Sequence, residues 1–215
     1  MDVLFYLICI LMGYLVGTVN PSYIISKIKG FDIRKRGSGN AGASNAVLVL
    51  GRFIGVACAL LDILKATFVI WLAKLLFPSL THTFAVTGIA CIVGHIFPFY
   101  MRFRGGKGLA CLGGTVLAFD WRVFLIMLAS EILVAILTNY ICFVPVTAGL
   151  VFPIVYGVMT HDVIGAVILL LGGLLITWKH KENFKRIRQG AEVHLSYLWN
   201  KNKEIERVQE KLNNQ

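Results

Sequence analysis

The sequence predicts an all-α integral membrane protein, a seven-helix transmembrane bundle with one short helix. Three observations support this fold class. Of the 215 residues, 57% are hydrophobic and 15% are charged, and the mean hydropathy is +0.75. Seven apolar segments follow one another along the chain, and basic residues gather between alternate segments. Together these features exclude an ordinary soluble domain.

The apolar segments cover residues 3–26, 53–77, 84–100, 109–119, 123–138, 142–159 and 163–178. The first is long enough to remain as a spanning helix. The fourth, which follows a glycine-rich turn, is too short to cross a hydrocarbon layer of about 30 Å. We therefore expect it to begin or end inside the protein. Residues 1–192 form the predicted membrane domain, and residues 193–215 form a polar cytoplasmic tail.

The distribution of basic residues predicts the orientation. With the N-terminus outside and seven crossings, eighteen of the 21 Lys and Arg residues lie on the inner side, including Lys201, Lys203 and Lys211 in the tail. Lys74 and Arg122 fall outside, and Lys65 falls within the membrane. The positive-inside rule thus places the C-terminus in the cytoplasm. The net charge of +10 is explained by membrane orientation and needs no nucleic-acid partner.

A glycine turn over residues 103–108 interrupts the apolar sequence with three glycines and two cations. Its members are Phe103, Arg104, Gly105, Gly106, Lys107 and Gly108. Glycine lets backbone N–H groups face an anion, so the turn is typical of a phosphate cradle. A nucleotide P-loop is excluded, because Met101 and Gly108 occupy the positions of its first glycine and its Ser or Thr. The alternative is a flexible basic turn between two helices.

Two further polar clusters fall on the same predicted side. The first loop, residues 27–51, carries glycines with Ser38, Asn40 and Asn45, which suits a phosphate or polyol and equally a solvated loop. His180, Asn183 and Arg186 recur every three residues after the last span, as one face of a helix would place them. That second pattern also fits a basic helix at lipid headgroups.

Ionisable residues inside the apolar segments admit structural and functional readings. Asp62 and Lys65 lie three residues apart, on one helical face, and form either a structural pair or part of a site. His95 ends a span, where a satisfied helix-end histidine is common. The five cysteines sit in apolar surroundings with no C-x-x-C pair, so we expect no metal site and no disulfide.

These motifs together resemble one family. Asp32-Ile33-Arg34, the run 37–45, Gly94-His95, the glycine turn, and the stretch from His180 through Glu192 resemble the bacterial acyl-phosphate-dependent glycerol-3-phosphate acyltransferases, the PlsY family. All three motifs of that family are present in order, and the similarity covers residues 1–192.

The resemblance implies a seven-helix enzyme of the bacterial inner membrane with its active site facing the cytoplasm. It would transfer a fatty acyl group from acyl-phosphate to the sn-1 hydroxyl of glycerol-3-phosphate, giving lysophosphatidate and phosphate for phospholipid synthesis. No metal or cofactor is required, and an acyl-phosphate-producing enzyme is the implied functional link. The implied catalytic residues are His180, Asn183, Ser38 and Lys107. Those implied to bind substrate are Gly105, Gly106, Gly108, Asn40, Asn45 and Arg104, and Glu192 would hold the tail in place.

Three positions depart from the family pattern. Leu48 stands where the family usually has a phosphate-clamping Arg, and we hypothesise that Arg52, one helical turn later, substitutes for it. Asn139 and Cys142 replace a common Arg and Ser between the fifth and sixth spans. These changes leave open an alternative function, a non-catalytic or acceptor-altered relative that binds acyl-phosphate or lysophospholipid. The general base is either His180 or a phosphate oxygen of a substrate.

Overall fold

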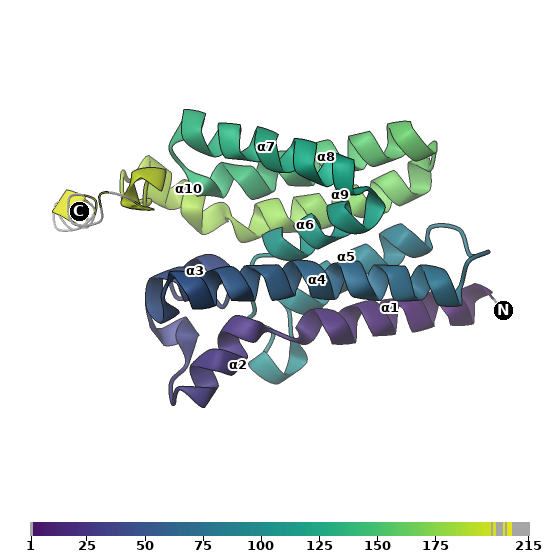
Figure 1. The fold of residues 1–215 in the computed structure, drawn as a ribbon, viewed down its shortest axis with the longest axis horizontal. Helices are drawn as coiled ribbons and strands as arrows, with labels where there is room; N and C mark the ends of the chain where they lie inside the picture. The colour runs from purple at the N-terminus through teal and green to yellow at the C-terminus, as the bar shows by residue number, and fades with distance from the viewer. Residues whose placement is uncertain (1, 199, 201–203, 205, 208–215) are drawn as a thin grey trace.

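The computed structural model describes residues 2–198, 200, 204, 206 and 207, and within these it is helical without any strand (Figure 1). This confirms the predicted all-α class. The α-helices are α1 (Asp2–Thr18), α2 (Pro21–Ile28), α3 (Ala43–Leu50), α4 (Arg52–Leu76), α5 (Thr83–Ile96), α6 (Leu109–Phe119), α7 (Trp121–Thr138), α8 (Val144–Thr160), α9 (Val163–Lys179) and α10 (Lys181–Arg188). Short 3-10 turns cover Ile33–Lys35, Phe99–Met101, Ile141–Phe143 and Leu195–Leu198.

The long helices run side by side along one axis of the molecule (Figure 1). Helix α1 packs on α5, α4 on α6, and α8 on α9. The start of α1 lies at one end of the bundle, whereas α2, α3 and α10 lie at the other (Figure 1). With an odd number of membrane crossings, the two ends of the chain lie on opposite sides, which agrees with this arrangement.

Five of the described segments are long and apolar enough to span a membrane, or six if α9 and α10, which are bent by 42°, form one span. The protein is thus a multi-pass membrane protein by length and composition. Helix α6 has 11 residues and is the short helix that the sequence predicts after the glycine turn. The count of seven crossings and the orientation stay predictions.

The predicted spans differ from the helices at two places. The first span was expected to be one helix, but it breaks at Val19 and Asn20. Asn20 caps α2 by accepting a 2.8 Å hydrogen bond from the Tyr23 N–H, and Pro21 follows at the first helical position. The third span, expected to reach Tyr100, leaves α-helical geometry after Ile96, shortly before Pro98.

The first loop also contains more structure than its polar composition suggested. Residues 43–50 form α3, which packs against α4, so that residues 29–42 are the main part of the loop without an α-helix. At the other end of the chain, Lys201, Lys203 and Lys211 lie outside the described residues.

Asp62 and Lys65 form an ion pair within α4, and Lys65 also contacts neighbouring parts of the chain. The Lys65 ammonium lies 2.6 Å from the Asp62 carboxylate and 3.2 Å from His95 Nδ1, and it donates to the Gly17 carbonyl at 3.0 Å. Donor atoms of Asp62, His95 and Cys111 also lie within 4.8 Å of one another. The Lys65 ammonium contacts both Asp62 and His95, so the protein itself supplies a cation to this cluster. These contacts favour a structural role for Asp62 and Lys65.

Candidate functional site

A basic cavity of about 760 Å³ opens at the end of the bundle that carries α2, α3 and α10. Eight basic and two acidic residues line it together with uncharged ones. The lining residues are Tyr23, Lys27, Asp32, Arg34, Lys35, Ser38, Gly39, Asn40, Tyr100, Arg102, Arg104, Gly105, Lys107, Lys179, Glu182 and Arg186. The first loop, the glycine turn and the start of α10 therefore face one space, and its excess of cations suits anionic ligands.

Asn45 shapes the part of the first loop that faces the basic cavity. Its side chain is fully buried. The amide nitrogen donates to the carbonyls of Ile33, Arg36 and Asn40 at 2.8–3.2 Å, and the amide oxygen accepts from the Ser38 N–H at 2.8 Å. With these bonds made inside the loop, Asn45 presents Ser38 and Asn40 to the cavity and does not line it.

The glycine turn is docked on the end of α5. The N–H groups of Gly105 and Gly106 donate to the carbonyls of Ile96 and His95 at 3.0 and 3.1 Å. A Cβ on Gly106 would lie 2.1 Å from His95 Nε2, so only glycine fits. These two amides hold the turn in place, so they are not the phosphate-binding groups of the expected cradle. Gly108, at φ 96°, precedes α6, and the first N–H groups of that helix have no intrahelical acceptor and suit an anion.

A chain of polar contacts joins the glycine turn to α10. The Lys107 ammonium donates to Asn183 Oδ1, and Asn183 Nδ2 donates to Glu192 Oε1 at 2.6 Å. The second oxygen of Glu192 accepts from Arg186 Nε at 2.6 Å. Asn183 and Glu192 are buried, whereas Lys107 and Arg186 reach the cavity. The two buried residues therefore orient two cations that face the ligand space.

Burial changes the protonation of two predicted catalytic residues. It lowers the pKa of Lys107 to about 8, and repulsion from Arg186 acts in the same direction. It also lowers the pKa of His180 to about 4, and the charge of Lys107 contributes. His180 Nδ1 lies 2.8 Å from the Ile176 carbonyl, so that nitrogen carries the proton and Nε2 is left as an acceptor. These shifts favour a hydrogen-bonding role for His180 over that of a general base.

Arg34 links the first loop to the segment just before the glycine turn, although the motifs predict no role for it. Its Nη1 donates to the Met101 carbonyl at 2.6 Å, while its Nε and Nη2 donate to Asp32 at 3.0 and 2.7 Å. Hydrogen bonding to Arg34 lowers the pKa of Asp32 to about 2, so this pair stays ionised. The guanidinium also lies 4.9 Å from the centre of the Tyr23 ring. The only sequence signal was the Asp32-Ile33-Arg34 match.

The structure sorts the predicted site residues into three groups. Those that line the basic cavity are Ser38, Asn40, Arg104, Gly105 and Lys107. Those packed behind its wall are Asn45, Gly106, Gly108, His180, Asn183 and Glu192. Arg52 begins α4, is exposed and does not belong to the lining found among the described residues, so its substitution for the clamp missing at Leu48 stays a hypothesis. The cavity instead takes arginines from elsewhere, among them Arg34 and Arg186.

Comparison with known families gives a single answer. Residues 7–190 match the family described as glycerol-3-phosphate acyltransferase. Glycerol-3-phosphate acyltransferase 1 of Oceanobacillus iheyensis is 37% identical over 92% of this chain and 99% of its own length. The glycerol-3-phosphate acyltransferase of Bacillus subtilis is 32% identical over 88% of this chain and 97% of its own.

Solved structures agree with the sequence matches. The crystal structure of PlsY, an integral membrane glycerol 3-phosphate acyltransferase, in its glycerol 3-phosphate form has a TM-score of 0.83 at 30% identity. The match covers 90% of this chain and 96% of that one. The lysophosphatidic acid form of the same protein has a TM-score of 0.79. The resemblance seen in the motifs is thereby confirmed, and the chain belongs to the PlsY family of glycerol-3-phosphate acyltransferases.

Proposed function

We propose that the protein transfers a fatty acyl group from acyl-phosphate to the sn-1 hydroxyl of glycerol-3-phosphate. The products are lysophosphatidate and inorganic phosphate, and a separate enzyme must supply the acyl-phosphate. One observation carries the proposal: a cavity with eight basic and two acidic residues receives side chains from all three motif regions. Both substrates carry a phosphate, so this charge balance supports a site that holds two anions side by side.

The proposed reaction needs mainly orientation. The sn-1 oxygen attacks the carbonyl carbon of the acyl-phosphate, the bond from that carbon to the phosphate oxygen breaks, and the leaving phosphate takes the hydroxyl proton. Holding two reactants in line can supply about 7–11 kcal/mol of the barrier. The mixed anhydride already has a good leaving group, and this chemistry uses no cofactor.

Each motif then has a part. Lys107 and the first N–H groups of α6 hold the acyl-phosphate's phosphoryl group, and the lysine stabilises the charge of the leaving phosphate. Ser38 and Asn40 orient the glycerol-3-phosphate, and Asn183 acts behind them by holding Lys107 in place. Neutral His180 accepts a hydrogen bond through Nε2, and its lowered pKa supports a phosphate oxygen as the proton acceptor.

The test is an assay with purified protein and radiolabelled glycerol-3-phosphate. Palmitoyl-phosphate, palmitoyl-CoA and palmitoyl-acyl-carrier protein are offered in parallel as donors. Product from palmitoyl-phosphate alone is the expected result. Preference for a thioester would contradict the donor assignment. Binding of palmitoyl-phosphate without turnover would favour the non-catalytic relative that the loss of Arg at Leu48 suggests.

We also propose that the cavity faces the cytoplasm across a bacterial inner membrane, since the basic residues gather at that end. The five native cysteines are buried, so a single new cysteine can be labelled selectively. Lys29 and Lys74 are both exposed; Lys29 precedes α4, and Lys74 lies in the last turn of α4. In intact cells a membrane-impermeant maleimide should label Lys74→Cys and spare Lys29→Cys. The reverse pattern would invert the topology.

A further inference from the structure

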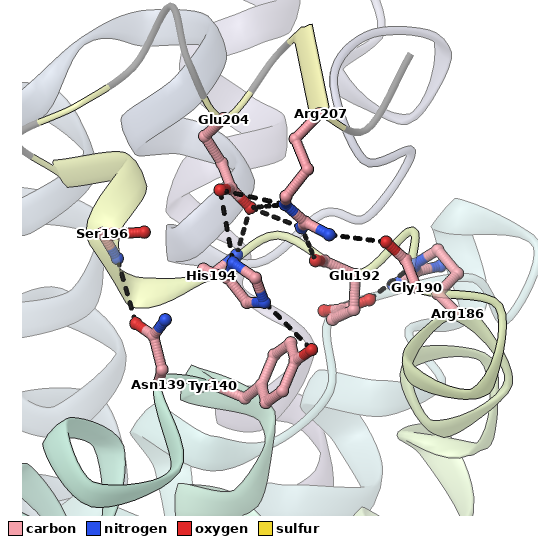
Figure 2. A network of polar contacts seen from close by, with 9 residues as sticks. All are labelled: Asn139, Tyr140, Arg186, Gly190, Glu192, His194, Ser196, Glu204 and Arg207. Atoms are coloured by element: carbon pink, nitrogen blue, oxygen red, sulfur yellow. Dashed lines mark hydrogen bonds and ion pairs between the residues drawn. The ribbon is translucent and has the colours of Figure 1, made fainter. Parts of the chain in front are cut away.

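Two described residues past the family match, Glu204 and Arg207, contact the stretch that follows α10. Residues 7–190 match the family, whereas Glu204 and Arg207 lie beyond that range. Glu204 is only 5% exposed, and Arg207 is half-buried beside it. Figure 2 shows both side chains converging on the stretch from Gly190 to His194.

Arg207 forms hydrogen bonds with the backbone on both sides of Ala191. Its Nη1 donates to the Gly190 carbonyl and its Nη2 to the Glu192 carbonyl, each at 2.6 Å (Figure 2). Glu204 pairs with Nη2 of Arg207 at 2.5 Å and also accepts the His194 N–H at 2.8 Å. Hydrogen bonds with an ionised donor are short and strong, and the guanidinium fork defines their direction. The backbone of Glu192 is therefore held by a charged, geometrically specific contact.

The segment has a second anchor on the turn between α7 and α8. His194 Nε2 lies 3.0 Å from the Tyr140 hydroxyl (Figure 2). The Leu195 N–H donates to the Asn139 carbonyl at 2.7 Å. The Ser196 N–H donates to Asn139 Oδ1 at 3.3 Å. Asn139 is one of the positions that depart from the family pattern, and here it serves the tail. The stretch around Glu192 is thus fixed from two sides.

Glu192, whose backbone Arg207 contacts, is also the residue whose carboxylate orients the cations of the cavity. The Glu192 carboxylate receives Asn183 Nδ2 and Arg186 Nε, both at 2.6 Å, and Asn183 in turn accepts from Lys107. A shift of the Glu192 backbone would carry its carboxylate, and with it the partners of both cations. Arg207 itself stands outside the lining of the basic cavity in the described part of the chain.

We propose that Arg207 is a positioning residue that acts through Glu192 on Lys107 and Arg186, so that the C-terminal tail forms part of the working enzyme. The proposal rests on the acyl transfer proposed above. Glu204 has the supporting role of orienting the guanidinium and holding His194. The tail predicted from composition as a polar extension thereby gains a specific task.

The first test compares Arg207→Ala, Arg207→Lys and the control Glu206→Ala in the full-length protein. Glu206 is exposed and adjoins Arg207, which makes it a matched control. With palmitoyl-phosphate and glycerol-3-phosphate, Arg207→Ala should lower kcat/KM about tenfold per folded molecule, because small displacements of reacting groups are costly. Arg207→Lys, which keeps the charge and loses the fork, should recover part of that loss, and Glu206→Ala should match the wild type.

The second test is a double-mutant cycle with Glu192→Ala, which removes the link between the tail and Asn183. If Arg207 acts through Glu192, adding Arg207→Ala to that background should change kcat/KM by less than about twofold. Multiplicative effects would overturn the proposal. So would an Arg207→Ala enzyme whose folded fraction falls while kcat/KM per folded molecule stays at the wild-type value.

Failure of this inference is distinguishable from failure of the proposed function. An active wild type with Arg207→Ala equal to Glu206→Ala refutes the positioning role alone. If the wild type turns over none of the donors, the acyl transfer is refuted instead. Calorimetric titration with glycerol-3-phosphate then tests the positioning role without turnover. Weaker binding by Arg207→Ala, restored in part by Arg207→Lys, supports it, and equal binding overturns it.

Discussion

The two walls of the basic cavity are built from different chemistry. One buried neutral amide, Asn45, holds the first-loop wall through four hydrogen bonds to backbone groups. The opposite wall depends on a chain of ionised and amide side chains from Lys107 through Asn183 and Glu192 to Arg186. Asn45 is fully buried, whereas the two cations of the opposite wall face the cavity, so we expect a lost partner to cost more stability in the first-loop wall.

The difference separates shape from charge. The Asn45 amide that holds the first-loop wall cannot titrate, so its hydrogen bonds are independent of pH. Failure of these bonds should appear as loss of folded protein. The wall that runs from Lys107 to Arg186, called the ionic wall, contains cations that we propose to bind the substrate anions, so its failure should appear as loss of turnover in a folded protein. Five predictions test this contrast, in order of decreasing effect.

Lys107→Met should lower kcat/KM by about 100-fold or more, because it removes the cation proposed to stabilise the leaving phosphate. The melting temperature should remain near that of the wild type. Steady-state kinetics and thermal denaturation in detergent measure the two quantities. Lys29→Met, an exposed lysine outside the cavity lining, is the control. A large loss of stability in Lys107→Met would show that the ionic wall also carries the fold.

Asn45→Ala should lower the free energy of unfolding by about 3 kcal/mol, because buried carbonyls of the first loop lose their donor. Activity should fall in proportion to the folded fraction. Denaturant titration followed by an assay of the folded fraction separates the two effects. A stable but inactive variant would place Asn45 in contact with substrate and contradict its assignment to the wall.

Arg34→Lys tests the residue that joins the walls. Lysine keeps the charge but cannot bridge Asp32 and the Met101 carbonyl with a fork, so KM for glycerol-3-phosphate should rise about tenfold. Arg122→Lys, exposed and outside the lining, should behave as the wild type. An unchanged KM in Arg34→Lys would mean that the walls keep their spacing without this link.

The pH profile should show one limb that belongs to the ionic wall. Lys107 has a pKa of about 8 and binds anions when protonated. Activity should therefore be full below that pH and fall as pH rises through it, by about tenfold per unit beyond. His180, with a pKa of about 4, is neutral across this range and should add no limb near its usual value of about 6.5.

The Lys107→Arg variant checks the assignment of that limb. Arginine stays charged to high pH, so its remaining activity should lose the alkaline decline. Persistence of the decline at the same pH would assign it to another group.

Arg52→Ala should have the smallest effect, within about twofold on kcat/KM, as is usual for exposed positions away from a site. The prediction opposes the hypothesis that Arg52 replaces the clamp missing at Leu48. A large rise in KM for glycerol-3-phosphate would restore that hypothesis.

Much of the fold was predictable from apolar runs. The short helix at residues 109–119 matches α6. Asn183 and Arg186 fall on α10, and His180 is the N-cap residue of that helix. The break at Asn20 was signalled by Asn-Pro, a typical helix start, yet the continuous apolar run hid it. Helix α3 was missed because eight residues beside a polar loop give little periodic pattern.

The site was predictable as three patches and not as a geometry. Nothing local shows that the Gly105 and Gly106 amides bind α5, or that Asn45 faces its own loop. Arg34 contacts a carbonyl 67 residues away, and such contacts exist only after the helices pack. The contacts of Glu204 and Arg207 were not predicted for a further reason, because no family motif covers these residues.

The docking of the glycine turn on α5 also bears on affinity. Because two of its amides are already bonded to the helix end, the turn has its final conformation before any phosphate arrives. Binding then immobilises little backbone, and the conformational entropy that a loose loop would lose is not subtracted from the interaction. The site that we propose for the leaving phosphate is in this sense preorganised.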